Sequence, residues 1–300
     1  MDQADQLDLL RLREDPATYE QAILQLQEDA AQDSAARFIL ESCYLEADRA
    51  GAFARFRKSR EMTAIRRLMS ILNVDLTMGV VEVGGGPGFL AEALAKDGGL
   101  NVALLEPNGE MVTGTGHLRA HCPDTLTLWN DLSAWHADVA RYGLLVTRNC
   151  IHHFPNISFV AATLRQKLID GAIWFAVREW YADTSQELYQ QLKTHPLSQR
   201  FGLYEWPFPA RHYVEAIEIA GFELLAVVPA GYDGDCLCSY AEAPPDAETS
   251  ARTQAFDALL GSCPQETVDR FWSAQGSRGK PTKWSPYLRP QVLVFRRRSI

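Results

Sequence analysis

The stretch VVEVGGGPGFL, residues 80–90, constrains the fold more than any other part of the sequence, because a run of valines leads directly into four glycines and a proline. Valine-rich runs favour strands. Glycine is placed where the backbone turns sharply or where another group must approach it closely. A glycine-rich turn between a strand and a helix is typical of folds that bind a ligand at that turn. The sequence therefore predicts a ligand here and leaves its identity open.

From residue 79 onward, short β-branched runs alternate with segments that carry apolar residues at three- and four-residue spacing. This alternation is typical of a parallel, doubly wound sheet with helices on both faces, so we predict an α/β fold. One of the helices is expected near residues 108–120. The expected strands are GVVEV, NVALLE, TLTLW, YGLLVT, GAIWFAVRE, ELLAVV and QVLVFRRR.

The N-terminal region and two insertions lie outside this alternation. Residues 1–73 have helical spacing throughout, which predicts an N-terminal helical cap or lid over an α/β domain at 74–300. Insertions are expected at 180–208 and 232–288. The first is rich in aromatic residues, and apolar pockets with a few polar groups are how small molecules are held. We therefore expect 180–208 to help form a lid over the ligand.

Composition and charge limit the binding partners and the cellular compartment that are expected for this chain. The net charge of −9 argues against a nucleic acid or an anionic membrane as partner. The acidic start MDQADQLDLL does not resemble a signal peptide, and the six cysteines show no framework spacing, so we expect a cytoplasmic protein with reduced thiols. No metal site is expected, because Leu118 in HLRAH stands where a zinc motif needs glutamate. The sequence is compatible with a monomer or a homodimer.

The spacing of the glycines separates the candidate ligands. A dinucleotide-binding turn has the pattern G-x-G-x-x-G, but Phe89 stands where the third glycine belongs. A phosphate-binding P-loop is excluded because no Gly-Lys-Ser/Thr follows. The run Glu82-Val-Gly84-Gly-Gly86-Pro-Gly88 instead resembles the first motif of the class I S-adenosylmethionine-dependent methyltransferases. Further pieces resemble that family in order as far as residue 229 and again at the last strand, with closest similarity to the small-molecule branch that includes quinone-biosynthesis methyltransferases.

This resemblance implies a seven-stranded, mostly parallel sheet that binds S-adenosylmethionine. Glu106 would accept hydrogen bonds from the ribose hydroxyls, although a strand-end carboxylate can also cap a helix. Asp131 would bind the adenine amino group and the Leu132 N–H a ring nitrogen, with helix capping as the alternative for Asp131. Asn149 would face the methionine part. The cofactor-binding residues expected on this basis are Glu82, Gly84, Gly85, Gly86, Gly88, Glu106, Pro107, Asp131, Leu132 and Asn149.

The fourth strand leads into VTRNCIHHFPN, where the resemblance places the incoming acceptor. His152 and His153 are candidate general bases, because histidine titrates near neutral pH. The alternative is that they only cap backbone or contact the cofactor. Arg148 is a candidate clamp for an acceptor carboxylate, while the simpler expectation is an ion pair with Glu179. The candidate residues for acceptor binding are Arg148, Tyr204 and Trp206, and those for closure over the cofactor are Phe53, Phe56 and Arg60.

Taken together, the sequence predicts methyl transfer from S-adenosylmethionine to a small-molecule acceptor by in-line displacement. The proximity of the two reactants alone can contribute about 7–11 kcal/mol to such a reaction. Three alternatives remain. A nicotinamide-dependent oxidoreductase would have a similar sheet, and a non-catalytic subunit that binds the cofactor would share the same binding residues. The third is an enzyme that uses the cofactor for a reaction other than methyl transfer.

Overall fold

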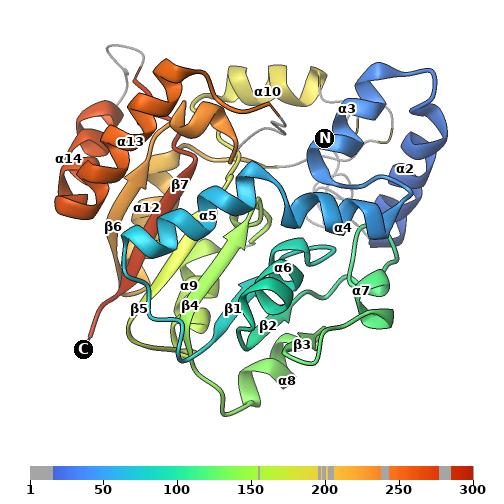
Figure 1. The fold of residues 1–300 in the computed structure, drawn as a ribbon, viewed down its shortest axis with the longest axis horizontal. Coiled ribbons are helices and arrows are strands. Elements are labelled where there is room, and N and C mark those ends of the chain that lie inside the picture. Colours follow the sequence, from blue (N-terminus) through green and yellow to red (C-terminus); the bar gives the residue numbers. More distant parts are fainter. Residues whose placement is uncertain are drawn as a thin grey trace, which may run out of the picture.

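A seven-stranded β-sheet runs through the middle of the computed structural model, which describes residues 16–154, 156–194, 197, 201, 206–237, 243–276 and 285–299 (Figure 1). The strands are β1 (Val80–Val83), β2 (Val102–Leu105), β3 (Leu126–Trp129), β4 (Tyr142–Arg148), β5 (Leu168–Val177), β6 (Phe222–Val228) and β7 (Val292–Arg297). Their order is β3-β2-β1-β4-β5-β7-β6. Strands β1 to β5 pair in parallel, and β7 runs antiparallel to both β5 and β6. The predicted fold class is confirmed.

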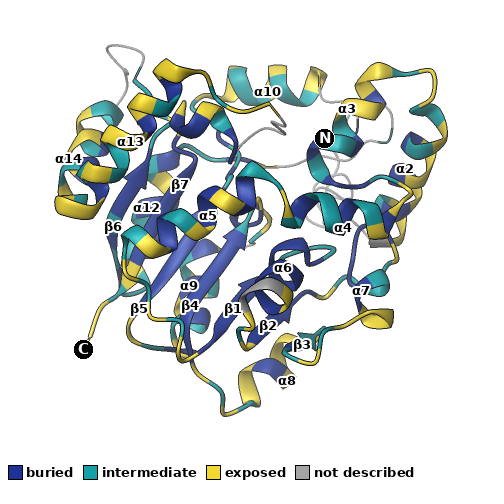
Figure 2. Ribbon diagram, in the orientation of Figure 1, coloured by how far each residue is buried: buried dark blue, intermediate teal, exposed yellow. Residues whose placement is uncertain are grey.

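The sheet separates two apolar cores, because successive side chains of a strand point to opposite faces. Val80 packs into one core and Val81 into the other, and Figure 2 shows the strands buried between the helical layers. The first core is covered by α4 (Arg49–Arg57), α5 (Arg60–Ile71), α6 (Phe89–Gly98) and α13 (Ala247–Ser262). The second is covered by α8 (Leu132–Ala137), α9 (Ile157–Arg165), α12 (Ala210–Ile219) and α14 (Pro264–Gln275).

The predicted N-terminal helical region is helical where it is described, but its helices pack in two different ways. Helices α2 (Pro16–Asp29) and α3 (Ser34–Cys43) form a small apolar cluster of their own with Val112. Helices α4 and α5 belong to the main core of the sheet instead. The expected boundary at residue 73 stays a prediction, although the packing joins α5 to the α/β domain.

The helix predicted near residues 108–120 is much shorter than expected, since α7 spans only Gly116–Ala120. The Asn108 side-chain oxygen accepts a hydrogen bond from Glu110 N at 2.9 Å, and its carbonyl accepts one from Thr115 N at 3.0 Å. Asparagine side chains compete with helical hydrogen bonds in this way. The residues between β2 and α7 therefore form a loop beside the glycine-rich turn.

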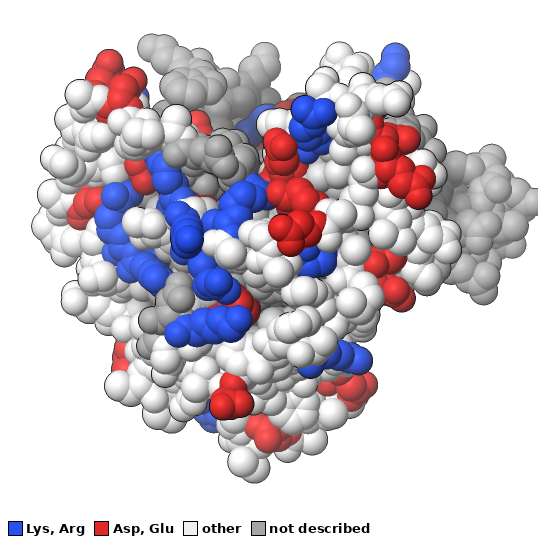
Figure 3. Space-filling view, turned by 45° about the vertical axis from the view of Figure 1, so that its right-hand side comes forward, with Lys and Arg blue, Asp and Glu red and all other residues white. Residues whose placement is uncertain are grey.

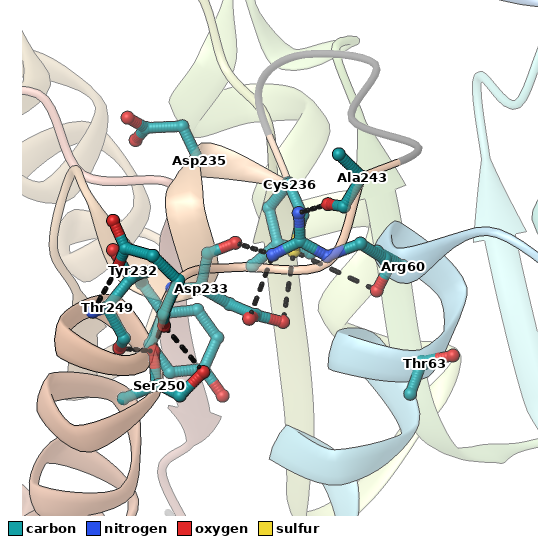
Figure 4. A network of polar contacts seen from close by, with 12 residues as sticks. Arg60, Thr63, Tyr232, Asp233, Asp235, Cys236, Ala243, Thr249 and Ser250 are labelled. Carbon is teal, nitrogen blue, oxygen red and sulfur yellow. Dashed lines mark hydrogen bonds and ion pairs between the residues drawn. The ribbon is translucent and has the colours of Figure 1, made fainter.

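Polar contacts fix α5 against the second insertion (Figure 4). Arg60 donates to Asp233 Oδ1 at 3.0 Å and to the carbonyl of Ala243 at 2.6 Å. Arg67 donates to Asp233 Oδ2 at 3.1 Å and to the Tyr232 hydroxyl at 3.0 Å. The short helix η2 (Tyr232–Asp235) thus lies beside α5, although the two are far apart in the sequence. The start of α5 is held in place above the sheet.

Basic side chains are concentrated on α4 and α5 in spite of the net negative charge. Residues 55–67 contain six lysines and arginines, and Figure 3 shows a band of Lys and Arg across one face of the molecule. Part of this charge is neutralised locally, because Arg57 pairs with Glu92 at 2.6 Å and Arg67 with Asp257 at 3.4 Å. These arginines therefore serve to attach the two helices to the rest of the domain.

The first insertion is attached to the segment before β7. It contains α10 (Ser185–Thr194), and Arg289 pairs with Asp183 at 2.9 Å and with Glu187 of that helix. Both insertions thus contact the region around the end of β5 and the start of β7. Within the described ranges, none of the helices has the length and apolar character needed to cross a lipid bilayer.

Candidate functional site

The glycine-rich turn after β1 has a shape that other residues could not adopt. Gly84, Gly86 and Gly88 have φ values of +66°, +54° and +83°, in the left-handed region that disfavours side chains. A Cβ added to Gly84 would lie 2.0 Å from the Cys150 sulfur, and one added to Gly88 would lie 2.6 Å from Leu104. The turn therefore presents bare backbone at the carboxyl end of β1.

Glu82 lies beneath this turn. Its side chain is 1% exposed and accepts a hydrogen bond from Ala91 N at 2.7 Å, in the first turn of α6. A Cβ on Gly85 would lie 2.6 Å from the Glu82 carboxyl carbon, so the backbone passes directly over it. Burial raises the pKa of Glu82 to about 7. The structure gives Glu82 a role in holding the turn to α6, and its contact with a cofactor stays a prediction.

Glu106 lies at the end of β2, beside the turn. Its Oε2 accepts a hydrogen bond from Gly86 N at 2.8 Å, and its Oε1 accepts one from Asn108 N at 2.8 Å. Burial raises the pKa of Glu106, and the two N–H donors oppose that shift. Each carboxylate oxygen retains a lone pair for a further donor. Pro107, the next residue, is exposed.

The end of β3 places two polar residues near Glu106. Asp131 Oδ1 accepts a hydrogen bond from Ala134 N at 2.6 Å, so Asp131 does cap α8 as the simpler expectation had it. Asp131 and Leu132 are both exposed, and their contacts with adenine stay predictions. Asn130, which the sequence analysis missed, donates to the Glu106 carbonyl at 2.6 Å and fixes the end of β2.

Glu20 of α2 stabilises the same loop from the outside. Its carboxylate accepts hydrogen bonds from Val112 N and Thr113 N, both at 2.9 Å, and also from the Thr113 hydroxyl at 2.9 Å. Asn108 in turn donates to that hydroxyl at 3.0 Å. The N-terminal helices are thereby joined to the loop that carries Glu106. Nothing in the local sequence indicated this contact, because its partners are more than 90 residues apart.

The end of β4 lies next to the turn, across the point where strand order reverses. Asn149 is exposed and has φ +51°. His152 is buried, and its Nδ1 lies 3.1 Å from Glu179 Oε2. Glu179 also accepts hydrogen bonds from Cys150 N and Ile151 N, both at 3.0 Å. His153 is exposed on the same short helix η1 (Ile151–His153), so the two histidines occupy very different environments.

Arg148 does not form the expected ion pair with Glu179. Its guanidinium donates two hydrogen bonds to Glu61 of α5, at 2.6 and 3.1 Å, while Glu179 is occupied by His152 and the start of η1. Burial alone would lower the pKa of Arg148, but the Glu61 carboxylate raises it above its ordinary value. The prediction of the partner was wrong because α5 folds back over the strand ends, which the local sequence does not reveal. Acceptor binding by Arg148 stays a prediction.

The remaining candidates are more scattered. Phe53 and Phe56 are buried and pack against Phe89, with ring centroids 4.5 and 5.8 Å apart, so they belong to the core under α4. Trp206 is exposed, and Tyr204 lies outside the described residues. Among the described residues, no cluster of His, Cys, Asp and Glu has the arrangement of a metal site.

The residues at these strand ends fit S-adenosylmethionine. The carboxyl ends of parallel strands meet at one edge of the sheet, and ligands of doubly wound folds settle where strand order reverses. At that edge this chain offers a turn without side chains, a carboxylate with free lone pairs and an exposed asparagine. A Cβ on Gly86 would lie 3.3 Å from the Thr113 carbonyl, which is a tight contact, so this position also favours glycine.

Comparison with known proteins identifies the family. The model of the methyltransferase domain family matches residues 53–227, which is more than half of the chain. The chain belongs to the methyltransferase domain family. No curated protein sequence matches this methyltransferase. Membership in the family implies a cofactor of the S-adenosylmethionine type.

Several solved structures are similar to this methyltransferase, at low sequence identity and with TM-scores below 0.5. The BH2331 protein of Bacillus halodurans, provisionally described as a methyltransferase, has 15% identity and a TM-score of 0.45, covering 79% of this chain and 100% of its own. The magnesium protoporphyrin IX methyltransferase ChlM of Synechocystis has 16% identity and a TM-score of 0.38, covering 54% of this chain and 73% of its own. The [4+2]-cyclase SpnF has 11% identity and a TM-score of 0.45, covering 81% and 84%. Similarity at this level does not bear on the reaction of this methyltransferase.

Proposed function

We propose that this methyltransferase transfers the methyl group of S-adenosylmethionine to a small-molecule acceptor. The observation that carries the proposal is the Glu106 carboxylate, which is held by Gly86 N and Asn108 N beside a turn of bare backbone. A buried carboxylate with remaining lone pairs suits a ligand that presents two neighbouring hydroxyls, as a ribose does. A net charge of −9 supports a small molecule over a nucleic acid or a membrane as partner.

The cofactor supplies an electrophilic methyl group on a positively charged sulfur, and the protein has to bind and orient both reactants. Glu106 would hold the ribose, Asp131 and the Leu132 N–H the adenine, and Asn149 the methionine part. The turn would position the cofactor against the end of β4. Orienting the nucleophile in line with the reacting bond then supplies most of the acceleration.

His153 is the better candidate for a general base. The His152 ring is fully buried and its Nδ1 faces Glu179, whereas His153 is exposed beside Asn149. A base must reach the proton that it removes from the acceptor. Glu179 would then serve to fix η1, and with it the backbone that carries His153.

Isothermal titration calorimetry with S-adenosylhomocysteine tests the cofactor assignment. We expect the wild type to bind it and Glu106→Gln to bind it at least ten-fold more weakly, because a carboxylate accepts more strongly than a neutral amide. Glu223→Gln, at a partly exposed glutamate on β6, is the matched control and should bind like the wild type. Tight binding of NADH without binding of S-adenosylhomocysteine would favour an oxidoreductase instead.

A second experiment tests the reaction. S-adenosylmethionine with a labelled methyl group is incubated with the protein and a small-molecule extract, and label is followed into the methylated products. We expect incorporation with the wild type and a loss of most of it with Glu106→Gln. If the wild type binds the cofactor but transfers no label across fractionated extracts, a non-catalytic binding role would replace the proposal.

A further inference from the structure

Arg178, the first residue after β5, has a backbone conformation that arginine rarely adopts. Its φ is +59°, and the neighbouring Asn149 after β4 has φ +51°. Asparagine tolerates this left-handed region, but for arginine it is unfavourable. The Arg178 N–H donates to the carbonyl of Gln291 at 2.8 Å, and Gln291 is fully buried. The surrounding structure therefore imposes the strain, and strained residues of this kind cluster at ligand-binding sites.

Arg178 also carries a charge that is only weakly paired within the described residues. Its Nη1 lies 3.7 Å from Glu61 Oε2, beyond hydrogen-bonding distance, and its side chain is only 14% exposed. The same carboxylate accepts two shorter hydrogen bonds from Arg148. Two guanidinium groups thus share one carboxylate, whose side chain is 4% exposed. Arg178 therefore has only this shared and longer ion pair within the described residues, and a poorly hydrated charge with a weak partner is unfavourable.

Two other carboxylates of the neighbouring segments are already engaged. Glu179 accepts hydrogen bonds from the start of η1 and faces His152. Asp233 is held by Arg60 and Arg67. Neither is paired with Arg178 in the described part of the chain. Arg178 follows β5 and Asn149 follows the paired strand β4, so the weakly paired guanidinium belongs to the β4–β5 side of the edge.

We propose that Arg178 binds a carboxylate group of the methyl acceptor, so that the acceptor is a small carboxylic acid. This inference rests on the proposed function. The guanidinium fork matches the two oxygens of a carboxylate, which it can bind through two parallel hydrogen bonds. The charge of one guanidinium matches that of one carboxylate, whereas a phosphate dianion would exceed it. The left-handed backbone at Arg178 would direct its side chain toward the acceptor carboxylate.

The test uses the full chain with and without saturating S-adenosylhomocysteine, titrated with formate, acetate and benzoate. Binding is measured by calorimetry and by the shift in melting temperature. We expect at least one of these carboxylates to bind the wild type, and Arg178→Gln to bind it at least ten-fold more weakly. Arg296→Gln, an exposed arginine on β7, controls for general ionic effects and should bind like the wild type. Affinity for S-adenosylhomocysteine should change less than two-fold in both variants.

A second variant separates ligand binding from a structural role. Arg178→Gly removes both the strain and the weakly paired charge, so we expect its melting temperature without carboxylate to rise above that of the wild type. A lower melting temperature would show that Arg178 stabilises the fold and would overturn the inference. Equal carboxylate binding by Arg178→Gln, or none of the three binding the wild type, would also overturn it. If S-adenosylhomocysteine does not bind, that result would instead contradict the proposed function. The carboxylate titrations without S-adenosylhomocysteine test Arg178 separately, so the two failures can be distinguished.

Discussion

The two sides of the candidate site are formed by different kinds of chemical group. On the β1–β2 side, a turn of glycine backbone and one glutamate lie at the proposed cofactor position, and the shape is set by the glycines. On the β4–β5 side, long side chains from distant elements meet, with Glu61 of α5 between Arg148 and Arg178. The comparison shows that the proposed cofactor side follows from a local motif, whereas the proposed acceptor side depends on how remote helices pack onto it.

Replacing Arg148 by Met should have the largest effect, because it leaves Glu61 buried with only the distant Arg178 as partner. Loss of one member of a buried ion pair costs about 3–5 kcal/mol of stability. Urea denaturation of the wild type, Arg148→Met and Arg148→Met with Glu61→Gln measures it. The double variant should recover part of the loss, and equal stability of the single and double variants would show that the pair contributes little.

Gly84→Ala probes the other side and should cost about 3 kcal/mol. The added methyl group would meet the Cys150 sulfur, and alanine is also unfavourable at a φ of +66°. Combining it with Cys150→Ala removes the collision but leaves the backbone strain, so we expect recovery of about half. Affinity for S-adenosylhomocysteine should follow the same order. No recovery in the double variant would mean that backbone conformation accounts for the whole effect.

His153→Ala tests which histidine serves the acceptor side. A general base contributes roughly 10²–10⁴-fold, so we expect a rate at least 10²-fold lower and the loss of the acidic limb of the pH–rate profile, where protonation of the base lowers the rate. Once an acceptor has been found, the maximal rate of methyl transfer is measured with saturating cofactor across a range of pH. His153→Gln is a second variant that keeps the size of the side chain. A near-normal rate and pH–rate profile in both variants would exclude His153 as the general base.

Glu82→Gln should have the smallest net effect and a characteristic pH dependence. The folded pKa of about 7 lies above the unfolded value of about 4.3. The group therefore adds stability that is full below pH 4.3 and is lost as the pH rises through 7. The limit is roughly 3 kcal/mol, but glutamine also weakens the hydrogen bond to Ala91 N, so we expect a net gain of about 1 kcal/mol at pH 8.

Denaturation at pH 4.5, 6 and 8 measures this difference, with Glu223→Gln at a partly exposed position as the control. The Glu82→Gln variant should lose less stability than the wild type between pH 4.5 and 8, and the control should not differ from the wild type. A wild type and a Glu82→Gln variant with parallel pH profiles would show that Glu82 is ionised at normal pH in the folded protein.

The features of the fold that depend on short-range sequence patterns could be predicted from the sequence. The alternation of strands and helices and the position of the glycine turn were confirmed. The length of the helix after β2 was wrong, because Asn108 closes a loop there. The partner of Arg148 was also wrong, since Glu61 lies 87 residues away and reaches it only after α5 has docked. Arg178 was missed because a left-handed backbone angle leaves no mark in a single sequence.

The position of β7 has a consequence for how the protein folds. It is the last of the seven strands in the chain, yet it lies between β5 and β6 and pairs with both. Until it arrives, β6 has no neighbouring strand in the described sheet and its edge stays open. During synthesis, the segment from β6 to α14 must therefore wait for β7 before its hydrogen bonds close, which makes this half of the sheet the region most exposed to mispairing or to capture by chaperones.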